Sequence, residues 1–246
     1  MTVHWRMSNG WDESADAWIT DQGERGDFSR EFVLDAVMLQ RIEARTFENA
    51  LDVGCGEGRF CRLLRKRGIA VTGIDPTQAL LQKARERDPH GDYREGRAEA
   101  LDFADASFDL VVSYLTLIDI PDVRKAIPQM VRVLKPGGTL LIANINGFIS
   151  ACADVTWVRG ADGSYLHYPL DHYLDERVMW VSWRGIRLQN WHRPLSLYMN
   201  LLLAENLRLT FFDEPAAHGG DAAHVARYHR APWHMVMEWR KDAGAG

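Results

Sequence analysis

The sequence of 246 residues has few cysteines, no long apolar run and no excess of positive charge. Cys55, Cys61 and Cys152 form no C-x-x-C pair, which argues against a disulfide framework or a zinc site, so we expect a reducing, cytoplasmic compartment. No window approaches the ~18 uninterrupted apolar residues of a membrane span, and residues 1–12 contain no apolar stretch of signal-peptide length. Lys and Arg number 29 against 34 Asp and Glu, so neither a nucleic-acid nor a membrane partner is expected.

What is present is an ordinary globular composition, with 46% hydrophobic and 26% charged residues. The length suits a single α/β domain with an elaboration. Between residues 49 and 146, short β-rich apolar runs alternate with helical patterns, which predicts βαβ units around a parallel sheet. The predicted strands are residues 50–53, 71–75, 92–95, 108–114 and 139–144, followed by 207–212 and 234–239.

The flanks of this core, residues 48–147, have other patterns. Residues 1–47 predict a helical cap, with one helix opening at 14–18 and another over 32–42. Residues 148–192 lose regular periodicity and carry eight aromatic residues, which we interpret as an inserted substrate cap. Residues 193–240 predict a return to the sheet through a helix at 195–204, with a long surface loop at 213–232.

Three alternate glycines, Gly54, Gly56 and Gly58, stand between the first strand and the first helix. A glycine has no Cβ and adopts positive φ, so such a loop can bring bare backbone against a ligand. The dinucleotide pattern G-x-G-x-x-G would require glycine at Arg59, which disfavours an oxidoreductase using a nicotinamide cofactor. Asp75, at the end of the second strand, could accept hydrogen bonds from a ribose. The alternatives are a tight turn without a ligand and a helix N-cap at Asp75.

Four segments in order carry a resemblance to a known family: LDVGCGEGRF (51–60), VTGIDPTQALLQKARE (71–86), REGRAEALDFADASFDLVVSYLTLIDIPD (94–122) and VRVLKPGGTLLIAN (131–144). The chain resembles the class I S-adenosylmethionine-dependent methyltransferases, in the group with the small-molecule type 11 domain. The resemblance implies a Rossmann-like α/β fold: a seven-stranded, mostly parallel sheet with an antiparallel last strand, helices on both faces and a helical and aromatic cap. It also implies S-adenosyl-L-methionine as cofactor and methyl transfer to an oxygen or nitrogen of a small-molecule acceptor; no oligomeric state is predicted.

The resemblance also implies cofactor contacts, which fall on Asp52, Gly54, Cys55 and Gly56 for the methionine part, Asp75 and Pro76 for the ribose, Arg97, Ala98 and Glu99 for the adenine, and Ser113 and Tyr114 for the methyl side. Arg97 replaces the acidic residue usual in the family, and a guanidinium cannot accept a hydrogen bond from the adenine amino group. Adenine recognition would then fall to Ala98 backbone groups, to Glu99 or to stacking by Arg97. Ile118 and Asp119 stand where the family often has two histidines, so no metal or base is carried over from that pair.

The acceptor site is expected among aromatic and polar residues outside the core. The candidates are Trp11, Trp18, Tyr168, Tyr173, Trp183 and His192, with Trp5 posing the same choice between ligand contact and packing. His192 is the candidate catalytic base, with His167 as a second candidate, and a buried, hydrogen-bonded role is the alternative for His192. Four late histidines at 218, 224, 229 and 234 match no zinc spacing, so no metal is expected. The alternative function is that of a protein that binds S-adenosylmethionine without catalysis or acts on a macromolecular acceptor.

Overall fold

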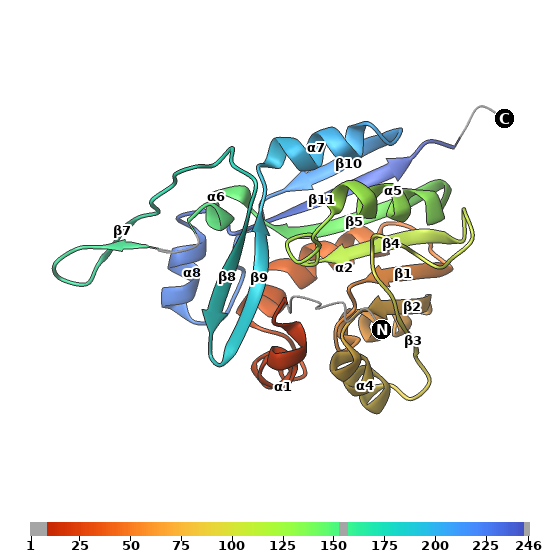
Figure 1. Cartoon of the computed structure of the whole chain (residues 1–246), viewed down its shortest axis with the longest axis horizontal. Coiled ribbons are helices and arrows are strands. Elements are labelled where there is room, and N and C mark those ends of the chain that lie inside the picture. The colour runs from red at the N-terminus through yellow and green to blue at the C-terminus, as the bar shows by residue number, and fades with distance from the viewer. Residues whose placement is uncertain (1–8, 153–156, 244–246) are drawn as a thin grey trace, which may run out of the picture.

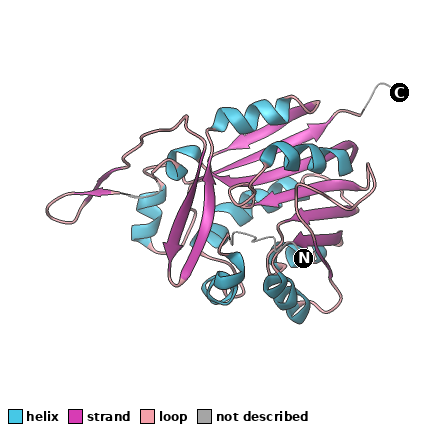
Figure 2. Ribbon diagram, viewed as in Figure 1, coloured by secondary structure: helices cyan, strands magenta, loops and turns pink. Residues whose placement is uncertain are grey.

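The computed structural model describes residues 9–152 and 157–243, and a seven-stranded sheet forms its centre (Figures 1 and 2). The sheet order is β10-β11-β5-β4-β1-β2-β3. Its strands are β1 (Asn49–Val53), β2 (Ala70–Asp75), β3 (Asp92–Glu95), β4 (Phe108–Tyr114), β5 (Leu134–Ile145), β10 (Leu207–Asp213) and β11 (His234–Lys241). β11 runs antiparallel to both β5 and β10, whereas β3, β2, β1, β4 and β5 pair in parallel. All seven predicted strands and the antiparallel last strand are therefore confirmed.

Helices cover both faces of the sheet. The helical elements are α1 (Trp11–Gln22), the π-helix η1 (Arg30–Leu34), α2 (Asp35–Glu43), α3 (Arg59–Arg65), α4 (Gln78–Arg87), α5 (Val123–Val133), α6 (Gly147–Ser150), α7 (Leu195–Leu203) and α8 (Ala222–Tyr228). Successive residues of β4 pack to opposite sides: Val111 lies in a core with α5 and α7, and Leu110 and Val112 lie in a core with η1, α2 and α3. Because both faces are covered, the central parallel strands β1 and β4 are buried along almost their whole length, whereas the edge strand β3 buries only Tyr93.

The inserted segment contains regular structure that the sequence pattern did not predict. It forms a small hairpin of β6 (Val158–Arg159) and β7 (Tyr165–His167) and a longer hairpin of β8 (Arg177–Trp183) and β9 (Ile186–His192). Arg184 and Gly185 make the turn of the longer hairpin, both with positive φ (44° and 83°), as a two-residue turn between twisted strands requires. The cap in this segment is thus mainly of β-structure, and the expected helical contribution comes from α1 and the short α6.

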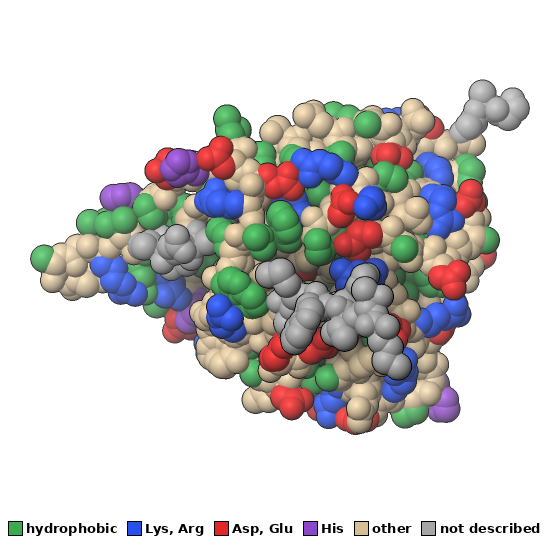
Figure 3. Space-filling model, in the orientation of Figure 1, with side chains coloured by type: hydrophobic (Ala, Val, Ile, Leu, Met, Phe, Trp, Pro, Cys, Tyr) green, Lys and Arg blue, Asp and Glu red, His purple; other side chains and the backbone are tan. Residues whose placement is uncertain are grey.

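The segment at 213–232 is also more regular than predicted, because it contains α8. The carboxylate of Asp221 accepts a hydrogen bond from the backbone N–H of His224 at 3.0 Å and so caps this helix. α8 has only seven residues, which is too short for a helical pattern of apolar residues to be recognised among the Ala, Gly and His residues of this segment. Among the described residues, no helix is both long and apolar enough to cross a membrane. On the face shown in Figure 3, side chains of both charge signs are interspersed.

The β8–β9 hairpin is tied to the sheet at its base by a buried arginine. The Arg193 guanidinium is fully buried and donates to three backbone carbonyls between β4 and α5: Leu117 (3.1 Å), Ile120 (2.8 Å) and Pro121 (2.9 Å). It also pairs with Glu176 at 2.8 Å. Hydrogen bonds from Arg124 and from Arg193 lower the pKa of Glu176 to about 2.

We expect Arg193→Met to lower the free energy of unfolding by about 3 kcal/mol, because it leaves buried carbonyls without donors and Glu176 without its buried partner. Arg124→Met is the matched control, since Arg124 pairs with the same Glu176 but is 53% exposed. That control should change stability by about 0.5 kcal/mol or less. Urea denaturation compares them, and equal losses would contradict the anchoring role of Arg193.

Candidate active site

The glycine loop after β1 adopts the conformation that only glycine accommodates easily. Gly54, Gly56 and Gly58 have φ of 77°, 55° and 76°. A Cβ on Gly54 would lie 2.2 Å from the Thr116 side chain, and one on Gly58 would lie 2.6 Å from the Tyr93 ring. These two glycines therefore permit close packing within the protein, whereas Gly56 faces a cavity, where an added Cβ would first meet Trp18 at 3.3 Å.

A cavity lies at the carboxyl edge of the parallel strands and collects most of the residues predicted to contact a cofactor. Its walls include Asp52, Gly54, Cys55, Gly56, Asp75, Pro76, Arg97, Ala98, Glu99 and Tyr114, together with Trp11 and Trp18. Ser113 does not line it. Successive side chains of a strand point to opposite faces, so Tyr114 reaches the cavity and Ser113 is buried in the sheet packing, with its Oγ lacking a partner among the described residues.

Asp75 joins the glycine loop to the end of β2. Its Oδ2 accepts a hydrogen bond from the backbone N–H of Gly56 at 2.9 Å, and its Oδ1 accepts one from Thr77 at 2.8 Å. The N-cap of α4 is Thr77, so the alternative role of Asp75 as that cap is wrong. Burial raises the pKa of Asp75 above its usual value. Each carboxylate oxygen has a second lone pair that can accept a bond from a ligand.

Asp52, at the end of β1, is buried with an unsatisfied oxygen. Its Oδ2 accepts a hydrogen bond from the Cys61 thiol at 3.2 Å, while Oδ1 has no partner among the described residues. Burial raises the pKa of Asp52 to about 7. Burial likewise raises the pKa of the Cys55 thiol, to about 11, which suits a packing role and not a nucleophile. A buried carboxylate oxygen with a free lone pair in a cavity wall is suited to receive a cationic or N–H group.

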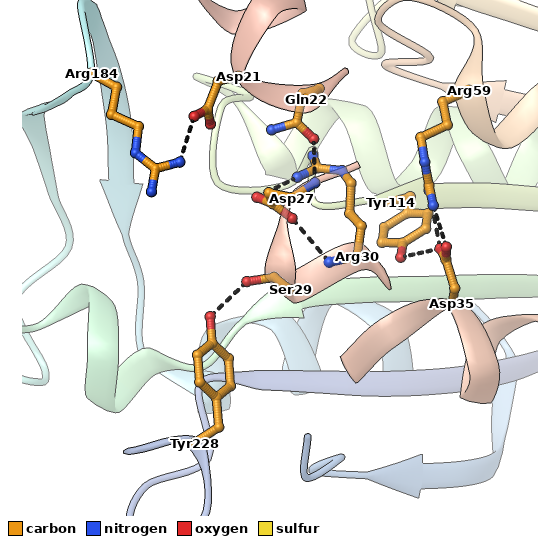
Figure 4. A network of polar contacts seen from close by, with 10 residues as sticks. All are labelled: Asp21, Gln22, Asp27, Ser29, Arg30, Asp35, Arg59, Tyr114, Arg184 and Tyr228. Atoms are coloured by element: carbon orange, nitrogen blue, oxygen red, sulfur yellow. Dashed lines mark hydrogen bonds and ion pairs between the residues drawn. The ribbon is translucent and has the colours of Figure 1, made fainter. Parts of the chain in front are cut away.

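The N-terminal helices close this cavity through the polar network shown in Figure 4. Asp35, on α2, accepts hydrogen bonds from the Tyr114 hydroxyl at 2.8 Å and from the Arg59 guanidinium. Arg30, on η1, pairs with Asp27 at 3.0 Å, and its guanidinium lies 5.6 Å from the Trp18 ring centroid. Asp35 therefore ties α2 to α3 and to the end of β4, and the Arg30 guanidinium of η1 lies 5.9 Å from the ring centroid of the same Tyr114.

A second cavity of about 590 Å³ adjoins the first, between the β8–β9 hairpin, α1 and the ends of β5 and β11. Its aromatic walls are Trp11, Trp18, Trp180, Trp183, Trp191 and Trp233, and its polar groups include Asp27, Arg30, Asp119, Asn190 and His234. Such a volume and such walls are typical of a small-molecule site. Of the predicted acceptor residues, Trp11, Trp18 and Trp183 lie here, and Trp5 is outside the described residues.

His192, Tyr168 and Tyr173 are not in the walls of either cavity. His192 is fully buried; its Nδ1 lies 2.7 Å from the Ser150 hydroxyl and its Nε2 lies 2.8 Å from the Tyr173 carbonyl oxygen. Both ring nitrogens are thus engaged, which favours the buried, hydrogen-bonded alternative over a catalytic base. Tyr173 accepts a hydrogen bond from the Leu195 backbone, and Tyr168 packs on Trp157, so these tyrosines hold the cap together. His167 is exposed on β7 and also lies outside the cavities.

Sequence reasoning did not single out Asp119 and Asn190 as site residues. Asp119 follows the end of β4, and its Oδ1 accepts a hydrogen bond from Asn190 Nδ2 at 2.6 Å. Burial, together with the nearby Asp75 carboxylate, raises the pKa of Asp119 to about 8. A carboxyl group just beyond a strand end at the carboxyl edge was the available signal for Asp119. No such signal existed for Asn190, because the hairpin that carries it was not predicted.

The part of the chain that forms most of this site is similar in sequence to known methyltransferases. Residues 51–142 match the family described as "Methyltransferase domain". The chain is 36% identical over 111 residues to the malonyl-[acyl-carrier protein] O-methyltransferase of Enterobacter lignolyticus, covering 45% of this chain and 44% of that protein. It is 35% identical over 127 residues to the ubiquinone biosynthesis O-methyltransferase of Maricaulis maris, covering 47% and 50%.

The chain thus spans about half the length of the curated relatives it matches. Among solved structures, the S-adenosylmethionine dependent methyltransferase of Mesorhizobium loti superposes with a TM-score of 0.75 at 24% identity, covering 89% of this chain and all of that one. The fold is therefore that of the S-adenosylmethionine-dependent methyltransferases, as the sequence resemblance implied.

Replacement of Asp52 by asparagine tests its electrostatic environment. Burial raises the pKa of this carboxyl from 3.8 to about 7, so the folded state holds the proton more tightly than the unfolded state, and the stability from this group is lost as pH rises through about 7. Asparagine does not titrate. The stability of Asp52→Asn relative to wild type should therefore increase from pH 5 to about pH 7, by at most about 3 kcal/mol, and should level off by pH 8.5.

Thermal unfolding at several pH values measures this difference. Asp16→Asn, at an exposed position of α1, controls for the loss of one carboxyl group. A difference for Asp52→Asn that does not change with pH would contradict the raised pKa.

Proposed function

Because residues 51–142 match a methyltransferase domain, we propose that the chain is an S-adenosyl-L-methionine-dependent methyltransferase that acts on an oxygen or nitrogen of a small molecule. The observation that carries the proposal is the pair of buried carboxylates, Asp52 and Asp75, which line one cavity together with the glycine loop, where Asp75 accepts a hydrogen bond from the Gly56 backbone. The adjoining aromatic cavity supplies a separate place for an acceptor.

The residues present fit this cofactor. The free oxygen of Asp52 would receive the ammonium group of the methionine part, and the spare lone pairs of Asp75 would receive ribose hydroxyls. Ala98 and Glu99 would flank the adenine, with Arg97 beside it; Arg97 is half-exposed and lies 3.7 Å from Glu99. When bound, the cofactor supplies a methyl group on a positively charged sulfur. Carboxylates around the cavity favour that charge.

The chain's own task is then to align the acceptor and to exclude water. Trp11 and Trp18 lie in the walls of both cavities, 5.7 Å apart in an edge-to-face pair, and would form the boundary across which the methyl group passes. The β8–β9 hairpin covers the second cavity, which supports a small acceptor over a nucleic acid or a protein surface. One curated relative is named for a malonyl group carried on a protein and the other for ubiquinone biosynthesis, so their names do not choose between acceptor sizes.

The competing functions predict different sites. A cofactor-binding protein without catalysis would have an apolar or closed acceptor cavity, but here Asp119 and Asn190 face it. A nicotinamide-dependent enzyme would need glycine at 59, where Arg59 instead holds Asp35.

We expect Asp75→Ala to reduce affinity for S-adenosylmethionine by about ten- to a hundredfold, because it removes hydrogen-bond acceptors for the ribose and the support of Gly56. Isothermal titration calorimetry measures the loss, and circular dichroism checks folding. Asp92→Ala, on the neighbouring strand β3 but outside the cavity, is the control and should bind normally. Wild-type binding of NADH but not of S-adenosylmethionine would reject the proposed function.

A second substitution tests the adenine side. Arg97→Asp should maintain or tighten cofactor binding, because a carboxylate can accept a hydrogen bond from the adenine amino group and a guanidinium cannot. The same calorimetric titration applies. A large loss of affinity would show that Arg97 stacks on the adenine or that its pairing with Glu99 shapes the site.

A further inference from the structure

Asp119 occupies the boundary between the two cavities. Five described residues line both: Trp11, Trp18, Arg30, Leu115 and Asp119. Asp119 is the one carboxylate among these five, and the residue is partly buried. A group at this boundary is close to both the methyl donor and the acceptor of the proposed reaction.

The structure holds the Asp119 carboxyl in a fixed orientation. Its backbone N–H donates to the Thr116 carbonyl at 2.8 Å, which fixes the loop after β4. Its Oδ1 accepts from Asn190 Nδ2 at 2.6 Å, and Trp11 provides a further hydrogen bond. Asn190 lies on β9 and Trp11 on α1, so the cap and the N-terminal helix both position this carboxyl.

Among the titratable groups that line the second cavity, Asp119 is the one best suited to accept a proton. Burial raises the pKa of Asp119 most, and the Asp75 carboxylate raises it further. Arg30 lowers it, and the pKa of Asp119 is about 8. Asp27 is paired with Arg30. His234, which also lines the second cavity, is buried, and burial lowers its pKa to about 4, so it stays neutral and is a weak base. A general base with a pKa near the working pH is the most effective.

Among the oxygen acceptors that the proposed function allows, the walls favour one that needs this carboxyl as a base. A carboxylate acceptor would need no base and would be repelled by Asp119 and Asp75. An aliphatic alcohol is a much weaker acid than a phenol, so a base of this strength activates it less. A phenol ionises near pH 10, as tyrosine does, and its ring suits a cavity lined by tryptophans.

We propose that the second cavity takes a phenolic acceptor and that the Asp119 carboxylate, positioned by Asn190, receives the proton of its hydroxyl. This inference rests on the proposed function and names its acceptor class. In the step, the phenol oxygen forms the bond to the methyl carbon, the carbon–sulfur bond breaks with its electron pair remaining on sulfur, and the phenolic proton moves to Asp119. Asp119 then releases this proton to water when the product leaves.

The first test measures binding without turnover. Catechol and its dimethyl ether, 1,2-dimethoxybenzene, are titrated by tryptophan fluorescence between pH 6 and pH 8.5 in the absence of cofactor. Wild-type affinity for catechol should rise about tenfold as Asp119 ionises, because a carboxylate accepts the hydroxyl hydrogen bond more strongly than a neutral acid. Affinity for the ether, which has no hydrogen to donate, should not change.

Three variants make this test specific to Asp119. Asp119→Asn should bind catechol with little pH dependence. Asn190→Leu should move the midpoint to higher pH, because it removes a hydrogen bond that lowers the pKa of Asp119. Asp122→Asn, on the same loop but outside both cavities, keeps the helix cap and should behave as wild type.

Cofactor charge gives a second readout. Saturating S-adenosylmethionine should lower the pH midpoint of catechol binding, since a nearby positive sulfur favours the Asp119 carboxylate, whereas neutral-sulfur S-adenosylhomocysteine should lower it less. With catechol as methyl acceptor, Asp119→Asn should lower kcat at least about a hundredfold. Its affinity for S-adenosylmethionine should fall only by the factor that corresponds to the midpoint shift, because the coupling between the two sites is reciprocal.

Unchanged pH dependence in Asp119→Asn, or no catechol binding by the wild type, would overturn the inference. Failure of the wild type to bind S-adenosylmethionine would instead reject the proposed function, so the two failures are distinguishable.

Discussion

The carboxylate of Asp75 is the interaction on which the arrangement of the site depends. Its two oxygens hold the backbone of Gly56 and of Thr77, and so fix the loop after β1 against the end of β2. The Ile74 carbonyl reinforces this junction by accepting hydrogen bonds from Gly54 and Cys55. The backbone of two neighbouring strands is therefore joined at the edge where the ligand cavity opens. A ligand that contacts Asp75 would also contact the group that shapes the glycine loop.

Much of the core could be predicted from the sequence, because its signals are local. Each strand at 71–75 or 108–114 is an apolar run bounded by turn residues, and the alternation of Val111 with Leu110 and Val112 reflects two covered faces. The positions of the glycine loop and Asp75 could be predicted in the same way, because both follow the ends of parallel strands and so lie at the carboxyl edge of the sheet. The resemblance supplied the direction of β11, which local periodicity could not give.

The cap could not be predicted in the same way. Its hairpin depends on pairing between β8 and β9 and on contacts to α1, none of which appears as periodicity in a short aromatic-rich stretch. Tyr168, Tyr173 and His192 have residue types that suit both packing and ligand contact, and only the tertiary arrangement decides between them. Ser113 is absent from the cavity wall for a simpler reason: its side chain points to the face of β4 opposite to that of Tyr114.

The two ends of the β8–β9 hairpin are held by interactions of very different strength. At the base, the Arg193 guanidinium is sealed from solvent with four partners. At the tip, the ion pair of Arg184 with Asp21 at 2.8 Å, drawn in Figure 4, involves an arginine side chain that is 74% exposed. Exposed pairs of this kind contribute about 1 kcal/mol or less and weaken with salt. Added salt therefore weakens this ion pair at the tip. The uncharged hydrogen bonds between Ser14 and the Arg187 backbone, close to the turn, and the buried contacts of Arg193 are much less sensitive to salt.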